Sequence, residues 1–324
     1  MVKSMSEFIL GIDVGSISTN LVLLDKNKKI KYSSYIRTGG NPIRAVKIGL
    51  KQVNEKFPEI KINGVGTTGS ARNLIGTIVG ADLIKNEITA HATASSFFSP
   101  DIRTILEIGG QDSKLIILRN GVVVDFAMNS VCAAGTGSFL DSQSSRLKIP
   151  VEKFGEFALK SKEDVNIAGR CTVFAESDMI HKQQVGHSND DIIYGLCNSL
   201  VRNYLNNLGR GKELIEPIMF QGGVSENKGM IKAFEKTLGC KLIVPKHNKV
   251  MGAIGIALLV ANNLPEKTKF RGFSLSDKNI LTKSFNCDGC PNKCEVIEAY
   301  IENELLSRWN DRCGKWQISK QQEN

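Results

Sequence analysis

Two cysteines stand where a thiol could do chemistry. Cys132 opens the run Cys-Ala-Ala-Gly-Thr-Gly-Ser, and Cys171 lies in Gly-Arg-Cys-Thr-Val-Phe-Ala-Glu. Each precedes a segment that can begin a helix, and the unpaired N–H groups of a helix N-terminus lower the pKa of a nearby thiol. Thr172 is expected to cap the second helix. A closed zinc or iron–sulfur site takes about four ligands, so two thiols suffice only if a symmetric dimer supplies two more.

A second group of cysteines lies near the C-terminus, in a C-x₂-C-x₃-C pattern followed by one more cysteine. Its members are Cys287, Cys290, Cys294 and Cys313. Four thiols in one short segment predict a metal site within one chain, and the sequence leaves zinc and a second iron–sulfur cluster as open alternatives. Cys197 and Cys240 lie among apolar residues and are expected to be small core residues.

The run Asp-Val-Gly-Ser-Ile-Ser-Thr, residues 13–19, joins two short apolar strands. Gly15 lets the backbone approach a ligand closely, and Ser16 and Thr19 offer hydroxyl and amide donors. Asp13 can hold Mg²⁺ through water, because Mg²⁺ keeps much of its hydration shell. These features suit a triphosphate, although an ordinary hairpin turn would have the same composition.

A similar turn follows in Glu-Ile-Gly-Gly-Gln-Asp-Ser-Lys, residues 107–114. Gly109 and Gly110 expose backbone amides. Gln111 can orient an attacking water, and Asp112 can act at the metal. Lys114 lies in the next strand, and the sequence leaves open whether it belongs to this site or is a solvent-exposed charge.

A third glycine element, Gln-Gly-Gly-Val-Ser-Glu-Asn at residues 221–227, follows an apolar strand and opens a helix. Gly222 and Gly223 would let a nucleoside lie flat against the backbone. The chain contains no Gly-x-x-x-x-Gly-Lys-Ser/Thr motif and no Gly-x-Gly-x-x-Gly after a strand, which argues against a P-loop and a Rossmann fingerprint.

The arrangement of strand, polar turn, strand, turn and strand occurs twice, near residues 8–35 and 104–126. This weak duplication predicts an α/β protein with two related lobes that face a cleft. Helices are expected at 42–56, 192–206, 228–238 and 251–262. We place the first lobe at 1–100, the second at 101–262 and a Cys-rich extension at 263–324.

Composition narrows the functional classes. Hydrophobic residues make up 41% of the 324 residues, which supports a sizeable core, and the net charge of +9 is moderate. This charge is compatible with an acidic partner or a polyphosphate, and without a basic tract it does not indicate nucleic acid. No apolar run reaches the ~18 residues that span a bilayer. Neither a membrane association nor a signal peptide is expected, and the predicted compartment is the cytoplasm.

The two hairpin turns and the Gly-Gly-Val-Ser-Glu-Asn element resemble those of the actin / sugar kinase / Hsp70 superfamily. The two cysteine motifs are similar to those of the activators of 2-hydroxyacyl-CoA dehydratases, within the BadF/BadG/BcrA/BcrD ATPase family, over residues 7–262. This resemblance implies a two-lobed ATPase that hydrolyses ATP with Mg²⁺. It also implies a homodimer with one [4Fe–4S] cluster, held by Cys132 and Cys171 of each subunit.

The resemblance further implies that the protein injects electrons into a partner enzyme. That partner would be a 2-hydroxyacyl-CoA dehydratase or a double-cubane cluster protein, and the electrons would come from flavodoxin or ferredoxin. The C-terminal extension also resembles the extensions of some large relatives of these activators.

The resemblance assigns roles to residues of the motifs. Asp13, Gln111 and Asp112 would be catalytic. The residues expected to bind the nucleotide are Gly15, Ser16, Thr19, Gly109, Gly110, Gly135, Thr136, Gly137, Gly222, Gly223, Asn227, Gly252 and Ala253. Glu107 departs from the family pattern, which has Asp, and this puts the metal geometry in doubt. His91 is expected to have a structural role.

Two other functions remain compatible with the sequence. A small-molecule kinase of the same superfamily, of the amino-sugar kinase type, would bind ATP but would not need Cys132 and Cys171. A non-enzymatic nucleotide-sensing scaffold would bind ATP without turnover.

Overall fold

The computed structural model describes residues 7–129, 132–169 and 171–319. Its contacts divide the chain into two compact units: unit 1 is Met1–Asn86 with Ile256–Asn324, and unit 2 is Glu87–Gly255. The lobe boundaries expected after residues 100 and 262 do not coincide with the limits of these units. That they are the limits of folding domains stays a prediction.

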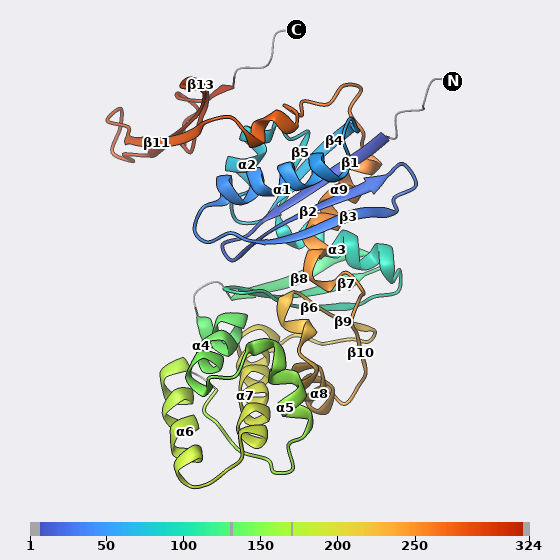
Figure 1. Ribbon diagram of the computed structural model, residues 1–324, viewed down its shortest axis with the longest axis vertical. Helices are drawn as coiled ribbons and strands as arrows, with labels where there is room; N and C mark the ends of the chain where they lie inside the picture. Colours follow the sequence, from blue (N-terminus) through green and yellow to red (C-terminus); the bar gives the residue numbers. More distant parts are fainter. Residues whose placement is uncertain (1–6, 130–131, 170, 320–324) are drawn as a thin grey trace. The chain divides into compact units, whose positions relative to one another are not determined.

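Unit 1 contains a mixed five-stranded sheet (Figure 1) with the order β3-β2-β1-β4-β5. Its strands are β1 (Glu7–Val14), β2 (Ser18–Asp25), β3 (Ile30–Arg37), β4 (Lys61–Thr68) and β5 (Leu83–Ile84). The first three are antiparallel neighbours, and β4 and β5 continue the sheet in parallel. Both helices α1 (Pro42–Lys56) and α2 (Arg72–Val79) bury apolar side chains with this sheet.

Helix α1 has the predicted bounds of 42–56, for local reasons. Asn41 caps it by accepting a 2.9 Å hydrogen bond from Arg44 N, and Pro42 starts it with a φ angle already suited to a helix. Val46, Leu50 and Val53 lie on one face and are buried in the core of unit 1.

Unit 2 repeats the strand arrangement of unit 1, in the order β8-β7-β6-β9-β10. The strands are β6 (Thr104–Ile108), β7 (Ser113–Arg119), β8 (Val122–Asn129), β9 (Ile218–Gln221) and β10 (Leu242–Ile243). Again the first three are antiparallel, and the last two join in parallel. The two sheets therefore have corresponding strand orders, which confirms the duplication predicted from the two hairpins.

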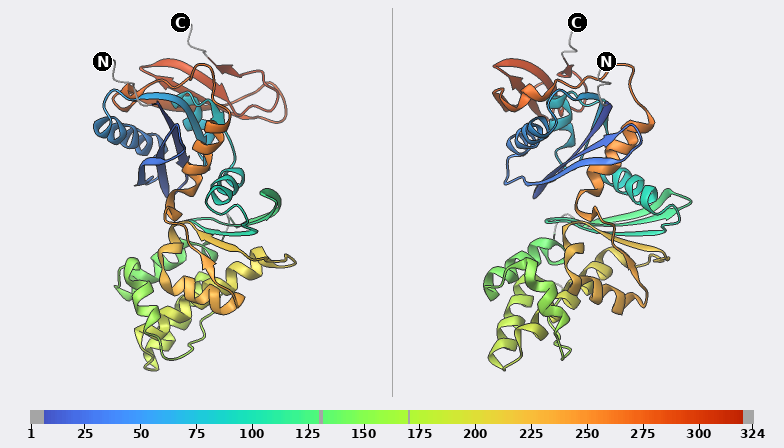
Figure 2. Two further views of the ribbon diagram at one scale, coloured as in Figure 1. Left: turned by 90° about the vertical axis from the view of Figure 1, so that its right-hand side faces the viewer. Right: turned by 45° about the vertical axis from the view of Figure 1, so that its right-hand side comes forward.

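Helices cover both faces of the unit 2 sheet. On one face, five helices (α4 to α8) and the sheet share the apolar core, with Phe139, Phe154, Leu200 and Phe234 fully buried (Figure 1 and Figure 2). The helices of this unit are α3 (Glu87–Phe98), α4 (Gly137–Leu147), α5 (Phe154–Leu159), α6 (Thr172–Gln184), α7 (Asn189–Tyr204) and α8 (Lys228–Leu238). Strand β7 points Leu115 and Ile117 into this core, so Lys114, which directly precedes Leu115, points to the opposite face, which α3 contacts.

Helix α9 (Met251–Asn262) contains the point where unit 2 ends and unit 1 resumes. In unit 1, its residues Ile256 and Val260 lie against Gly66 of β4, where a Cβ would come within 2.7 Å of both side chains. The glycine therefore permits the helix to approach the strand closely.

The C-terminal extension is part of unit 1 and forms a small antiparallel sheet of its own. Its strands are β11 (Ile280–Asn286), β12 (Glu295–Ile301), β13 (Glu304–Trp309) and β14 (Ile318–Ser319). Leu275, at the start of the extension, is 1% exposed within the core of unit 1. Asp82 accepts hydrogen bonds from Thr268 Oγ1 at 2.6 Å and from Lys269 N at 2.8 Å, which ties the connecting segment to this unit. None of the described helices is long and apolar enough to cross a membrane.

Gly255 provides a test of packing within unit 2. A Cβ at this position would lie 1.8 Å from the carbonyl oxygen of Ala90 in α3, a backbone atom that has no room to move. Gly255→Ala should therefore destabilise the protein by about 1–3 kcal/mol, measured from the midpoint of urea unfolding. Gly209→Ala is the matched control, because the nearest atom to its Cβ would be 3.6 Å away. Equal unfolding midpoints for the two variants would contradict this packing.

Candidate functional site

The first polar turn, in unit 1, lies between β1 and β2. Gly15 N donates a 2.8 Å hydrogen bond to Ser18 O and closes the turn. Thr38, at the end of β3, donates through Oγ1 to Gly15 O at 2.9 Å, and its hydroxyl also lies 3.0 Å from Thr19 Oγ1. Thr19 is fully buried, while Ser16 is exposed at the turn. The hydroxyl of Thr19 therefore stabilises the turn from its buried side, and Ser16 is exposed to solvent.

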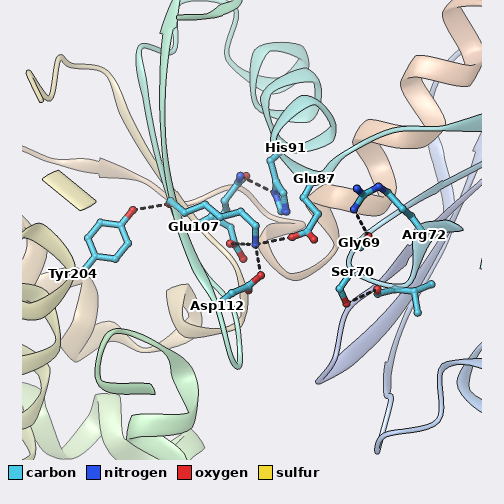
Figure 3. A network of polar contacts seen from close by, with 11 residues as sticks. Gly69, Ser70, Arg72, Glu87, His91, Glu107, Asp112 and Tyr204 are labelled. Atoms are coloured by element: carbon cyan, nitrogen blue, oxygen red, sulfur yellow. Dashed lines mark hydrogen bonds and ion pairs between the residues drawn. The ribbon is translucent and has the colours of Figure 1, made fainter. Parts of the chain in front are cut away.

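A loop that the sequence analysis did not single out packs against this turn. Gly69 has φ +95°, and a Cβ there would lie 2.4 Å from Val14 O, directly after Asp13. Ala71 N donates to the same oxygen at 3.0 Å, and Arg72 donates to Gly69 O at 3.0 Å (Figure 3). The signal in the sequence was the polar Thr-Thr-Gly-Ser run at the end of an apolar strand.

The second polar turn, in unit 2, lies between β6 and β7. Gly109 N donates to Asp112 O at 3.0 Å, and Gln111 is exposed at the tip. The start of α4 holds the other side of the turn. Gly137 N donates to Gly109 O at 2.9 Å, and Ser138 donates to Gly110 O through N at 2.8 Å and through Oγ at 2.6 Å. The carbonyl groups of the turn are thus engaged by a helix N-terminus.

The third glycine element follows β9 and lies against the second turn. Gly222 has φ +90°, and a Cβ there would lie 2.3 Å from Ile108 O and 2.8 Å from Glu107 Oε1. Gly223 is exposed beside it. Asn227 caps α8 through Oδ1, which accepts from Gly229 N at 2.9 Å and from Met230 N at 3.2 Å. Two elements predicted to bind a nucleotide therefore meet at Glu107.

The remaining residues expected near the nucleotide lie in two helices. Gly135 and Thr136 are buried before α4, where Thr136 Oγ1 donates to Ala133 O at 2.9 Å. Gly252 and Ala253 are buried in α9. The roles proposed for these residues toward a ligand stay predictions.

A network of buried charges surrounds Lys114 in unit 2. The side chain of Lys114 is 2% exposed, so the solvent-exposed alternative for this residue is wrong. Its ammonium lies 2.7 Å from Glu87, 3.0 Å from Glu107 and 2.9 Å from Asp112. Figure 3 shows the three carboxylates pointing toward this one group. Although burial alone would lower it, the carboxylates hold the pKa of Lys114 well above its usual range, so the group is charged.

Two neighbours of Lys114 have displaced pKa values. Burial raises the pKa of Glu107 to about 8 despite the opposing charge of Lys114. Burial also lowers the pKa of His91 to about 3, and its Nδ1 accepts a 3.0 Å hydrogen bond from Gln221 Nε2. His91 is therefore neutral and fixed in place, which agrees with the structural role expected for it.

Cys132 and Cys171 both lie in unit 2 and are both partly exposed. The Asn129 side chain holds the backbone of Cys132, accepting from its N at 3.0 Å and donating to its O at 2.9 Å. Cys171 itself takes the N-cap position of α6, so the expectation that Thr172 caps this helix is wrong by one residue. Arg170 of this motif lies outside the described residues.

Asn203, a buried residue of α7, connects the two cysteine segments. Its Nδ2 donates to Gly169 O, two residues before Cys171. Its Oδ1 would lie 2.8 Å from a Cβ on Gly135, three residues after Cys132. The segment before one cysteine and the segment after the other thus meet at the same side chain.

The tail cysteines lie in two loops of the extension. Cys287 is buried, and its Sγ accepts hydrogen bonds from Trp316 Nε1 at 3.2 Å and from Gly289 N at 3.4 Å. These hydrogen bonds lower the pKa of this thiol. Because Trp316 follows Cys313 by three residues, this contact brings the second loop to the first. Within the described ranges, no three His, Cys, Asp or Glu side chains are grouped so that they could hold one metal ion. Of the other two cysteines, Cys197 is fully buried in the core, as predicted, and Cys240 is partly buried beside it.

Gly222 tests whether the junction at Glu107 matters for nucleotide binding. Gly222→Ala would force a Cβ against Ile108 O and Glu107 Oε1 at a φ that disfavours side chains. We expect ADP affinity, measured by titration calorimetry, to fall at least about tenfold. Gly239→Ala is the matched control, because Gly239 has a similar φ of +73° with no atom near its Cβ position. Equal ADP affinities in the two variants would contradict the role of this junction.

The comparisons with known proteins agree with this geometry. Residues 10–260 match the BadF/BadG/BcrA/BcrD ATPase family. The (R)-2-hydroxyglutaryl-CoA dehydratase activating ATPase of Acidaminococcus fermentans is 35% identical over 257 residues, which are 78% of this chain and 97% of that protein.

Two solved structures are also similar. Component A of (R)-2-hydroxyglutaryl-CoA dehydratase from Acidaminococcus fermentans has a TM-score of 0.73 at 33% identity and covers 79% of this chain and 98% of its own. The activator of 2-hydroxyisocaproyl-CoA dehydratase from Clostridium difficile, with bound ADPNP, has a TM-score of 0.72 at 31% identity and covers 79% and 94%.

These similarities confirm the predicted actin / sugar kinase / Hsp70-like ATPase fold. The family match ends at residue 260, so the extension lies beyond it. By its two glycine turns, its fold and its matched length, the chain belongs to the BadF/BadG/BcrA/BcrD ATPase family, and its relatives include activators of 2-hydroxyacyl-CoA dehydratases.

Proposed function

We propose that this chain is an ATP-hydrolysing electron donor that passes low-potential electrons to a partner enzyme. The observation that carries the proposal is the bonding between the second polar turn and the start of α4. Gly137 and Ser138 hold the carbonyl groups of Gly109 and Gly110, and Cys132 precedes Gly137 by only five residues. A change at the turn on ATP binding or hydrolysis would therefore act directly on the segment that carries Cys132.

The nucleotide would bind with its phosphates at the two polar turns and its nucleoside at Gly222 and Gly223. The binding of ADPNP by a relative supports this assignment. Asp13 would hold Mg²⁺ through water, and Asp112 would take part at the metal. The donor set fits this ion, because the side chain of Asp112 is 34% exposed beside the turn, and Mg²⁺ prefers oxygen ligands.

Cys132 and Cys171 fit a share in one [4Fe–4S] cluster per homodimer. Both thiols are partly exposed, and the cluster takes four thiolates, so two copies of the chain would complete the set. Next to Cys171, the apolar side chains Val173 and Phe174 are 67% and 66% exposed. A second copy that covers them would remove this apolar surface from water.

When bound, the cluster supplies one-electron redox chemistry. One electron would come from reduced flavodoxin or ferredoxin and would pass to a 2-hydroxyacyl-CoA dehydratase or a double-cubane cluster protein, while ATP is hydrolysed to ADP and phosphate. The chain's own part is to bind the nucleotide, to hold the thiolates and to move the cysteine segments. Several relatives are named as activators of such dehydratases, and this supports the proposed class of partner.

We also propose that the tail binds a metal, zinc or a second iron–sulfur cluster, through Cys287, Cys290, Cys294 and Cys313. The two N–H groups on Cys287 Sγ and the approach of the Cys313 loop support this site. The thiols would gather on binding, as in small domains whose metal sites form only with the metal.

Iron content tests the shared cluster. Anaerobically purified protein should contain about four iron atoms per dimer beyond those of the tail, and Cys171→Ser should lose them while it keeps its affinity for ADP. Cys240→Ser is the matched control and should keep its iron. Wild-type protein that takes up no iron after anaerobic reconstitution would sink the proposal. ATP turnover that depends on a hydroxylated metabolite would instead favour the kinase.

The tail site needs a background without the shared cluster. In a Cys171→Ser variant, any remaining metal should disappear when Cys287→Ser is added, because Cys287 is the buried thiol of the tail. Elemental analysis would measure the loss, and the absorption spectrum would distinguish iron from zinc. Unchanged metal content after Cys287→Ser would rule out the tail site.

A further inference from the structure

Lys114 is a buried cation in unit 2, in the strand that follows the second polar turn. Its side chain is 2% exposed, whereas the side chain of Asp112, two residues earlier, is 34% exposed. A buried ammonium is strongly unfavourable unless it is paired and hydrogen-bonded. Lys114 therefore cannot serve as a surface contact for a ligand, but Asp112 can.

The ammonium group has three hydrogens, and each can bind one of the three carboxylates around it. These carboxylates come from three different places in the fold: Glu87 from the first turn of α3, Glu107 from β6 and Asp112 from the polar turn (Figure 3). The Tyr204 hydroxyl, from α7, donates to the carbonyl of Lys114 at 2.7 Å and holds its backbone. The side chain of Lys114 is thus held by three parts of the fold and its backbone by a fourth, and the side chain holds the turn in return.

Asp112 is held at two points. Its Oδ2 accepts from Lys114 at 2.9 Å. Its carbonyl oxygen accepts from Gly109 N at 3.0 Å, and its Oδ1 would lie 2.9 Å from a Cβ on Gly109, so the carboxylate lies close over the glycine backbone. Without Lys114, Asp112 Oδ2 would lose its hydrogen bond to the ammonium, and the carboxylate would no longer be held over the glycine backbone.

We propose that Lys114 is a positioning residue for ATP hydrolysis: it holds the Asp112 carboxylate over the second polar turn, in the orientation that meets the Mg²⁺-bound nucleotide. The inference rests on the proposed nucleotide site and adds to it a residue that touches neither nucleotide nor metal. Lys114 would thus have two separate effects. By holding Asp112 it would affect the Mg²⁺-dependent part of nucleotide binding, whereas by tying α3 to the sheet it would affect only stability.

Three variants separate these effects. Lys114→Met removes the cation, and the double variant Lys114→Met/Glu107→Gln also removes one of the facing carboxyl groups, so that it folds where the single variant does not. Glu87→Gln breaks the ion pair to α3 but leaves the pair to Asp112. Lys236→Met, which breaks an exposed pair with Asp164 in the same unit, is the control for the loss of an ion pair.

The measurement is ADP affinity with Mg²⁺ and with EDTA, by titration calorimetry, alongside the melting temperature. With Glu107→Gln alone as the reference, we expect the double variant to lose at least about tenfold of the gain in ADP affinity from Mg²⁺, while its affinity in EDTA differs from that reference by less than about twofold. Glu87→Gln should lower the melting temperature and keep the full gain from Mg²⁺, and Lys236→Met should change neither.

A double variant that melts early but keeps the wild-type gain from Mg²⁺ would overturn the inference, because Lys114 would then only stabilise the fold. An equal loss of affinity with Mg²⁺ and with EDTA would overturn it as well. Wild-type protein whose ADP affinity does not depend on Mg²⁺ would overturn the proposed nucleotide site, and the role of Lys114 with it.

Discussion

The structure of unit 2 depends on one buried charge, the ammonium of Lys114. Three carboxylates surround it at 2.7–3.0 Å, and they come from a helix, a strand and a turn that are separate in the sequence. A buried ion pair of this kind adds little net stability compared with apolar packing, yet the removal of one partner is costly. Each of the three side chains therefore ties its own element, α3, β6 or the polar turn, to Lys114. Glu107 lies beside both Lys114 and Gly222.

A second constraint joins that turn to the cysteines. The carbonyl groups of Gly109 and Gly110 are the acceptors for the first N–H groups of α4, and Cys132 lies just before this helix. Asn203 then relates the Cys132 segment to the segment that leads into Cys171. The second polar turn, the start of α4 and the buried side chain of Asn203 thus form a continuous series of contacts between the turn and the two cysteine segments. Such a path gives a physical basis for coupling between nucleotide and thiolate, provided that the turn has two arrangements.

Local patterns in the sequence predicted a large part of the fold. The bounds of α1 follow from its Asn-Pro start and its apolar spacing, and the repeated hairpins follow from polar turns between apolar strands. The charge network could not be predicted in this way, because Glu87 and Lys114 are far apart in the sequence and meet only when α3 lies on the sheet. The cap of α6 was predicted one residue late, since Thr was preferred over Cys on propensity. The hydrogen bond from Trp316 to Cys287 likewise depends on how two loops fold together, which the spacing of the cysteines does not reveal.

In the function that we propose, ATP acts on the thiolates of Cys132 and Cys171. The most direct test is the electron paramagnetic resonance spectrum of the anaerobically reduced protein, recorded without nucleotide, with Mg²⁺-ADP and with Mg²⁺-ATP, in a variant whose tail cysteines are replaced by serine. We expect a reduced iron–sulfur signal whose g values or line shape change when Mg²⁺-ATP is added. A signal that is identical in all three conditions, while calorimetry shows the nucleotide bound, would contradict it.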